Sequence, residues 1–354
     1  MKNYCLSLLI SALFFIGCAE RKVVVESEIE SPLIANDISN QKVSSFAEDA
    51  QGHIWMGTFR GLNRYNVHEF HQYFCTDEQN SLPDNQIQTL YKDSRDRLWI
   101  STVNGMALYT EQDNFKRIPM ETPSRNSVQI LEDKSGRIYI NTSVSLCRYD
   151  EDRETFVDLL SLINNGFSIA SHCFITPSND LLLASSMSIK MFDVETMQLK
   201  DSVAVQNYPG YYAMMKDGRL WMSSYAGLAI YNTNTFAFEE VPEIIRNHPE
   251  LYKSSVSYMC QYGEASIIFN TEKNGLFLYN KAEGTFRHQA ENGFPFTVPD
   301  VKINCMFEDS RNNLWIGSYD QGYYVIYDYQ GRFNNDSWLK SSIGQKSVVS
   351  VDCD

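Results

Sequence analysis

The chain has 354 residues, of which 43% are hydrophobic, and a formal net charge of −14 at pH 7. This apolar content is enough for a core, and 13% aromatic residues with only 10 prolines favour strands over disorder. The acidic balance excludes the basic footprint of a nucleic-acid binder, so no nucleic-acid partner is expected for this region.

Residues 1–19 are expected to form an export signal. One lysine precedes the apolar stretch Leu6–Ile16, which is short for a membrane span and fits a secretory signal. Two endings stay open: Phe15–Cys18 resembles a lipoprotein signal with Cys18 as the lipidated residue, and Gly17–Ala19 fits ordinary signal peptidase. We therefore expect an exported protein in the periplasm or cell envelope of a Gram-negative bacterium. It would meet the membrane only through a lipid anchor or a span outside this sequence.

One sequence design recurs seven times through residues 43–345, after a polar lead-in at 20–42. Each copy has an acidic turn, a short apolar run, a small pair of residues, a loop and a second run. The copies at Asp49–Asn66 and Asp309–Asp328 show it most clearly. The equivalent central residues lie about 39–47 positions apart and are Trp55, Trp99, Tyr139, Leu182, Trp221, Ile268 and Trp315. This period predicts an all-β fold, a seven-bladed β-propeller of four-stranded antiparallel blades.

Each copy also predicts an innermost strand with alternating polar and apolar residues. These strands are expected at Val43–Glu48, Ile87–Lys92, Val128–Glu132, His172–Thr176, Tyr211–Met215, Val256–Gln261 and Ile303–Glu308. Small or polar residues within them, such as Ser45, Gln129 and Cys305, are expected to face a narrow channel. A short helical turn is predicted within Glu243–Lys253.

Residues 346–354 again resemble a first strand that runs into its turn. This strand either closes the ring or begins a further repeat of a longer chain, and truncation is the interpretation we favour. In a seven-bladed ring, Val23–Val25 is a candidate for a closing outer strand.

The repeated acidic turns and tryptophans are interpreted as structural. Five turns carry an aspartate: Asp49, Asp93, Asp133, Asp217 and Asp309. Recurrence at one turn favours local hydrogen bonding over calcium binding or acid–base chemistry. Glycines before the third strand are expected to allow tight bends, at Gly61, Gly105, Gly227, Gly275 and Gly322.

The search for other chemistry indicates no metal, no cofactor and no catalytic residue. His68 and His71 stand near Cys75, but side chains three apart on a strand point to opposite faces. No nucleophile elbow or phosphate loop is present in the sequence. The cysteines outside the export signal lack close pairs, and most are expected to act as small hydrophobic residues within strands.

The repeat resembles a known family at the pattern D-x-x-G-x-[IL]-W-[IM]-G-T-x-x-G-L-N-R-Y-[DN]. Residues Ala50–Asn66 and Ser310–Ser318 match it closely, and the resemblance extends over residues 38–354. The family is the two-component regulator propeller repeat. It is typical of the periplasmic sensor region of hybrid two-component systems in gut Bacteroidetes. The resemblance implies an N-terminal sensor fragment of a receptor that detects oligosaccharides and dimerises through regions absent from this sequence.

The loops between second and third strands are the candidate ligand-binding site. Their variable polar and aromatic residues suit sugar hydroxyls and sugar rings. The candidates are Arg60, Asn104, Tyr225, Lys273, Asn274, Tyr319 and Asp320.

Three functions are weighed. The first is non-catalytic sensing of glycan-derived oligosaccharides, in which binding shifts the arrangement of a receptor dimer. The second is a free-standing envelope lipoprotein that binds glycan or protein. The third is a propeller lyase or hydrolase, which would need histidine, arginine and carboxylates together at the channel mouth.

Overall fold

The computed structural model describes residues 33–35, 37–66, 69–122, 124–125, 127–142, 144–159, 172–207, 209–291, 294–296 and 301–327. The predicted export signal with Cys18, the run Val23–Val25 and residues 346–354 lie outside this set. Among the described residues, no helix is long and apolar enough to cross a membrane.

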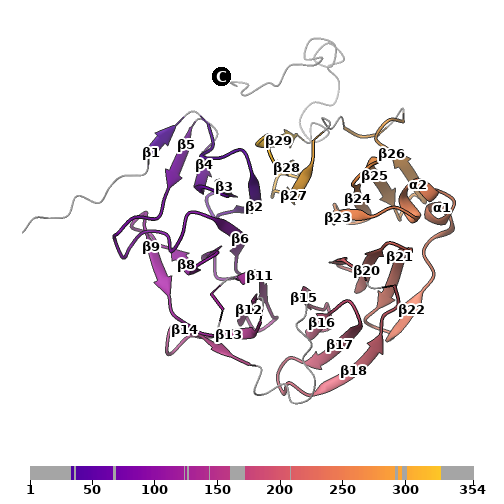
Figure 1. Ribbon diagram of the computed structural model, residues 1–354, viewed down its shortest axis with the longest axis horizontal. Helices are drawn as coiled ribbons and strands as arrows, with labels where there is room; N and C mark the ends of the chain where they lie inside the picture. Colours follow the sequence, from indigo (N-terminus) through magenta and orange to yellow (C-terminus); the bar gives the residue numbers. More distant parts are fainter. Residues whose placement is uncertain are drawn as a thin grey trace, which may run out of the picture. The chain divides into compact units, whose positions relative to one another are not determined.

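Seven antiparallel sheets are arranged as blades in a ring, which confirms the predicted seven-bladed propeller (Figure 1). The innermost strands, in chain order, are β2 (Val43–Glu48), β6 (Ile87–Lys92), β11 (Ser127–Glu132), β15 (His172–Ile175), β19 (Tyr211–Met214), β23 (Val256–Tyr262) and β27 (Ile303–Glu308). Three of these match the prediction at both ends, and the other four differ by one residue at one end.

The next two strands of each blade are joined by a tight loop. The second strands are β3 (Ile54–Thr58), β7 (Leu98–Thr102), β12 (Ile138–Thr142), β16 (Asp180–Ala184), β20 (Arg219–Ser224), β24 (Ser266–Thr271) and β28 (Leu314–Ser318). The third strands are β4 (Gly61–Tyr65), β8 (Gly105–Tyr109), β13 (Leu146–Asp150), β17 (Ser188–Asp193), β21 (Gly227–Asn232), β25 (Gly275–Asn280) and β29 (Tyr323–Ile326).

Outer strands complete six of the blades within the described residues. They are β5 (Phe70–Tyr73), β9 (Phe115–Ile118), β14 (Thr155–Asp158), β18 (Leu199–Ala204), β22 (Ala237–Glu239) and β26 (Thr285–His288). Two additions were not predicted: β1 (Leu33–Ala35) pairs antiparallel with β5, and β10 (Met120–Glu121) pairs parallel with β14. The lead-in therefore contributes a fifth strand to the first blade.

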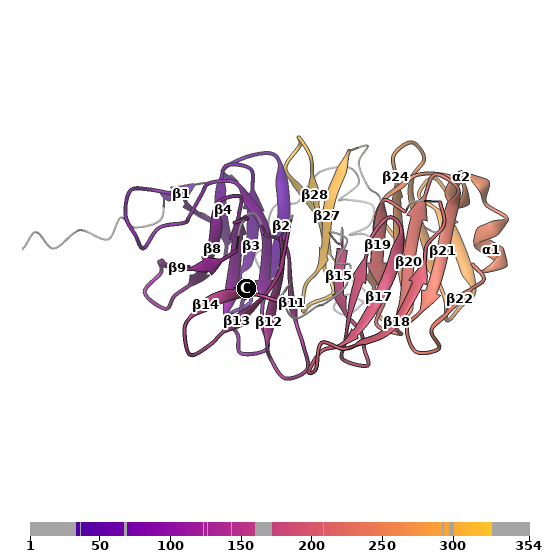
Figure 2. The same ribbon diagram turned by 60° about the horizontal axis from the view of Figure 1, so that its bottom comes forward.

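The predicted helical turn is confirmed as two short helices, α1 (Glu243–Arg246) and α2 (Pro249–Tyr252), at the outer edge between the fifth and sixth blades (Figures 1 and 2). They pack closely on the fifth blade, because a Cβ on Gly227 would come within 2.6 Å of the Tyr252 carbonyl oxygen. A glycine is required there, and its φ of 121° is in the region that disfavours other residues.

The core consists of seven hydrophobic clusters, each of which lies between two neighbouring blades of the described structure. One of them joins Phe46 and Met56 of the first blade to Cys305 and Trp315 of the seventh, so this cluster closes the ring. Because each blade buries its faces only against its neighbours, degraded copies survive inside the array. The described cysteines are free, and Cys147, Cys173 and Cys305 are buried like small apolar residues.

The expectation that Cys305 faces a channel is wrong, whereas half-buried Ser45 and Gln129 bond to the next inner strand. The Ser45 hydroxyl accepts a hydrogen bond from the Leu90 N–H at 3.0 Å, and the Gln129 amide bonds both the N–H and the carbonyl of Cys173. Cys305 is 8% exposed in the cluster that closes the ring. Blades converge most tightly at the centre, so small or hydrogen-bonding side chains there join one inner strand to the next.

The hairpin turns between first and second strands, which we call the turn rim, use their aspartates structurally. In the first, second, third and seventh blades, one carboxylate oxygen accepts two backbone N–H groups of its own turn. The other oxygen accepts the aromatic donor six residues later, from Trp55, Trp99 and Trp315 at 2.8 Å and from Tyr139 at 3.0 Å. The structural interpretation of these aspartates and tryptophans is therefore confirmed.

Asp217 is an exception to that interpretation. Met215 occupies the turn-opening position of the fifth blade, where its N–H bonds the Arg219 carbonyl. Asp217 lies two residues later, where its carboxylate pairs with Arg219 at 2.8 Å and Lys281 at 2.7 Å. The repeat pattern grouped Asp217 with the four turn aspartates, although Asp217 occupies a different position in its turn.

The turn rim also links neighbouring blades. The residue that ends an innermost strand reaches back to the preceding turn: Glu48 accepts from the Ser310 N–H, Glu132 from the Ser94 N–H, and Glu308 from the Gly263 N–H. Ion pairs between Arg97 and Glu151 and between Arg137 and Glu195 extend the same connections outward. Most of the charge on this rim is thus used to join the blades to one another.

Candidate functional site

The loops between second and third strands lie at the opposite edge of the blades, and we call them the loop rim. In every blade a Thr or Ser stands at the end of the second strand or directly after it, and in the first six blades its hydroxyl donates to a carbonyl three or four residues on. These hydroxyls belong to Thr58, Thr102, Thr142, Ser185, Ser224, Thr271 and, in the last blade as an acceptor from the Gln321 N–H, Ser318. The five glycines predicted to bend here all have positive φ. One frame thus presents different side chains from blade to blade.

The seven predicted site residues all lie on this rim, but they are spread over five blades. Arg60, Asn104, Tyr225, Lys273, Tyr319 and Asp320 are exposed, and Tyr225, at 75%, is the most exposed aromatic residue among those that the structure describes. Asn274 differs, because its amide donates to the Glu250 carbonyl at 2.6 Å and to the Ser254 hydroxyl at 3.0 Å. The nitrogen of that amide therefore secures the end of α2.

The structure brings one group of rim residues together where the seventh blade meets the first. The Lys42 ammonium lies 3.5 Å from the centre of the Phe59 ring and 3.7 Å from that of Tyr319. Lys302 lies 4.8 Å from the centre of the Tyr319 ring. The hydrogen bond and the charge of Lys42 lower the pKa of Tyr319. This seam cluster combines exposed rings with positive charge, the composition of a sugar-stacking surface.

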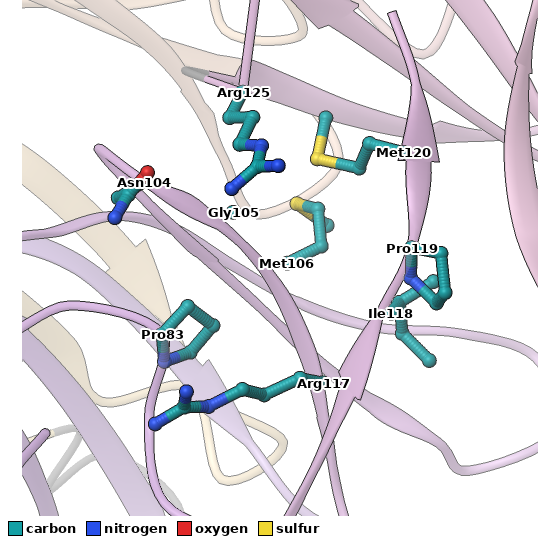
Figure 3. A pocket seen from close by; sticks show the side chains of 9 residues that line it. All are labelled: Pro83, Asn104, Gly105, Met106, Arg117, Ile118, Pro119, Met120 and Arg125. Carbon is teal, nitrogen blue, oxygen red and sulfur yellow. The ribbon is translucent and has the colours of Figure 1, made fainter. Parts of the chain in front are cut away.

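A second group lines a cavity of about 390 Å³ between the second blade and the connection to the third (Figure 3). Asn104 is the one predicted site residue that contributes to it. The full lining consists of Pro83, Asn104, Gly105, Met106, Arg117, Ile118, Pro119, Met120 and Arg125. A volume of this order is within the range of small-molecule sites.

Aromatic side chains gather on the innermost strands of the fourth, fifth and sixth blades. The His172 ring centre lies 5.9 Å from that of Tyr211, and Tyr211 lies 5.8 Å from Tyr258. The His172 Nδ1 atom is buried without a partner in the described structure, and burial lowers the pKa of this imidazole to about 4. His172 is therefore neutral at pH 7. Burial also raises the pKa of Tyr211 and Tyr258, so both stay protonated.

Sequence reasoning missed Lys42, Phe59 and Arg125. Phe59 occupies the same rim position as Tyr225 and Tyr319, each directly after the hydroxyl residue, so the repeat alignment contained that signal. Lys42 directly precedes its innermost strand, as Lys302 does in the seventh blade, so the repeat alignment contained this signal as well. Arg125 belongs to a connecting segment without such a counterpart, and only the fold places it on the rim.

The predicted absence of a metal site stays a prediction. No group of three histidine, cysteine or acidic residues that could hold a metal ion occurs among the described residues. His68 lies outside them. His71 bonds Glu69 at 3.0 Å, and the Cys75 thiol bonds the Pro83 carbonyl.

Parts of the chain match a known protein family. Residues 37–60, 81–104 and 297–320 match the family model described as the two component regulator propeller. These segments contain the first and second strands of blades one, two and seven and the turns between them. The fold and these motifs define a β-propeller built from regulator-type repeats. Three of the seven blades thus contain segments that match the two component regulator propeller family.

Similar solved structures include extracellular domains from B. thetaiotaomicron. The domain of the hybrid two component system BT3049 is 19% identical with a TM-score of 0.67; the alignment covers 83% of this chain and 42% of that one. The domain of BT4673 is 17% identical with a TM-score of 0.65, over 81% of this chain and 40% of that one. The present chain thus spans less than half of these domains.

Enzymes share the architecture as well. A catalytically inactive virginiamycin B lyase from Staphylococcus aureus, solved with quinupristin, is 13% identical with a TM-score of 0.61, over 83% of this chain and 98% of the lyase. At such identities these likenesses establish the fold. No curated protein sequence matches the chain.

Proposed function

We propose that this propeller is the ligand-sensing part of a hybrid two-component receptor, and that it binds glycan-derived oligosaccharides without chemical change. The family match and the likeness to extracellular domains of such systems support the sensor role. Export to the periplasm, with or without a lipid on Cys18, and dimerisation through regions beyond this chain are parts of the same proposal.

The observation that carries the proposal is the contrast between the two rims. Turn-rim charges are engaged in bonds within and between blades, whereas the loop rim exposes Arg60, Tyr225 and Tyr319 on a repeated frame. Exposed rings beside amides and charges are the groups that recognise sugar faces and hydroxyls. Binding there would favour one arrangement of the receptor dimer over another.

Titration calorimetry of the purified chain against neutral and acidic oligosaccharides tests this function. We expect saturable binding of at least one of them, with about tenfold weaker affinity after Tyr319→Ala, a loss of about 1.4 kcal/mol. Mass spectrometry of the recovered sugar should show an unchanged mass. A shortened or unsaturated product would instead favour the lyase or hydrolase, and binding of a protein but no sugar would favour the envelope-lipoprotein alternative.

A further inference from the structure

The cavity beside the second blade has an apolar floor and a polar mouth. Met106 and Ile118 are buried in its floor at 0% and 5% exposure. Asn104 and Arg125 are exposed and belong to the mouth. Figure 3 shows the Arg125 guanidinium extending over the cavity between Asn104 and Met120, above Met106.

The two arginines of the cavity differ in what they bond. Arg117 donates to the carbonyl oxygens of Ser81, Leu82 and Glu78, so its guanidinium holds the loop that precedes the second blade. Arg125 has no hydrogen bond or ion pair to any residue that the structure describes. Its five N–H donors therefore face the cavity and solvent.

The charge of the cavity is opposite to that of the chain. Asp and Glu number 44 against 30 Lys and Arg, yet none of the described residues that line this cavity is a carboxylate. Nearby Glu121 is paired with Arg153. An unpaired guanidinium above an apolar floor suits a ligand that carries an anion on an otherwise weakly polar ring. The planar fork of arginine matches a carboxylate or sulfate with two parallel hydrogen bonds.

We propose that this cavity binds the anionic group of an acidic sugar unit, with Arg125 on the carboxylate or sulfate. The Asn104 amide would bond a neighbouring hydroxyl, and the sugar's apolar face would lie on Met106 and Met120. This inference rests on the proposed sensing function and narrows its ligand class to acidic oligosaccharides.

The seam cluster is a weaker candidate for the same role. The Lys42 ammonium already lies between two aromatic rings, so an anion would have to compete with those contacts. The cavity beside the second blade instead offers Arg125, a cation without a hydrogen bond or ion pair to any described residue.

The test is calorimetry with three probes: tetragalacturonate, a sulfated oligosaccharide, and a neutral tetrasaccharide. The chain should bind at least one acidic probe more tightly than the neutral one. Arg125→Gln should weaken that binding by about tenfold or more, because a charge-assisted bond is lost. The affinity of the Arg125→Lys variant for the acidic probe should lie between those of the parent chain and Arg125→Gln. An ammonium keeps the positive charge but lacks the two parallel donors of a guanidinium.

Lys253→Gln is the matched control. Lys253 is an exposed cation after α2, and the substitution makes the same change in net charge outside the candidate site. This control should bind the acidic probe like the parent chain, and unchanged thermal unfolding of both variants shows that they fold.

Three other outcomes would contradict this inference. Equal binding of the acidic probe by the Arg125→Gln variant and the parent chain overturns the cavity assignment. Preference for the neutral probe overturns the acidic class while the sensing function stands. If none of the sugars binds, the sensing function fails and this inference fails with it.

Discussion

The two rims of this propeller use their polar residues differently. On the turn rim, Asp93 makes four hydrogen bonds, to two backbone N–H groups, Trp99 and Arg97. On the loop rim, Arg125 and Tyr225 are exposed, and no hydrogen bond joins either side chain to a described residue. Side chains that repeat from blade to blade stabilise the ring. Side chains that vary at equivalent loop positions are available for ligand recognition.

The largest effect is expected from the Asp93 side chain. Burial alone would raise the pKa of Asp93, but hydrogen bonds from Trp99 and Arg97 outweigh it and hold the pKa below its ordinary value. Asp93→Ala leaves these buried donors unpaired and should lower the free energy of unfolding by about 3–5 kcal/mol. Chemical denaturation measures this loss.

Asp217→Ala is the control for that comparison. Asp217 pairs with Arg219 and Lys281 through a side chain that is 38% exposed. Removing exposed pairs should cost about 0–1 kcal/mol. Equal losses for the two variants would contradict the distinction drawn between these two acids.

A pH-dependent effect is expected at His172, at the start of an innermost strand. Its folded pKa of about 4 lies below the ordinary value of 6.5, so the stability it contributes is present above pH 6.5 and lost as pH falls toward 4. The loss should reach at most about 3.5 kcal/mol, because each pKa unit corresponds to about 1.4 kcal/mol.

Comparing His172→Phe with the parent chain isolates this effect. The variant keeps an aromatic ring next to Tyr211 and removes the titrating nitrogen. As the pH falls from 6.5 to 4, the free energy of unfolding of the variant should rise relative to that of the parent chain. A constant difference over that range would show that His172 does not bind its proton differently on folding.

A smaller effect is expected where the turn rim joins two blades. Glu132 accepts from the Ser94 N–H at 2.9 Å and the Tyr91 hydroxyl at 3.1 Å, and Ser94 is exposed. Glu132→Ala should therefore cost about 1 kcal/mol in urea denaturation. Glu111→Ala, an exposed acid of the second blade, should cost almost nothing, and an equal cost would show that the link between blades contributes no stability.

The smallest effect on stability is expected on the loop rim. Tyr319 is 43% exposed, and its contacts with Lys42 and Lys302 are worth about 0.5–1 kcal/mol. Tyr319→Ala should therefore change unfolding little while weakening sugar binding. Phe238→Ala, at a 46% exposed ring on outer strand β22, should leave sugar binding unchanged. Equal losses of affinity would contradict a site on the loop rim.

The repeat predicted most of the fold because its signals are local. An aspartate turn and alternating residues place Val43–Glu48 and Ile303–Glu308 without reference to the rest of the chain. Strands β1 and β10 have three and two residues, and they exist because another strand offers a free edge. Periodicity contains no information about such partners.

The candidate site was less predictable for the same reason. The loop positions of Asn104 and Tyr319 follow from the repeat. Which loop residues share a surface also depends on the segments that precede the innermost strands. These segments supply Lys42 and Arg125. Likewise, the recurrence of Asp93 and Trp99 indicated structural roles, but their mutual hydrogen bond requires the turn to bring residues six apart together.

Hydrogen exchange of the purified chain, with and without the oligosaccharide that binds most tightly, tests the central claim most directly. On binding, we expect slower amide exchange in loop-rim peptides around residues 59–60, 103–106 and 319–322. Exchange in the turn-rim peptides around 49–53 and 93–97 should not change. Protection confined to the turn rim, or spread equally over both rims, would contradict this claim.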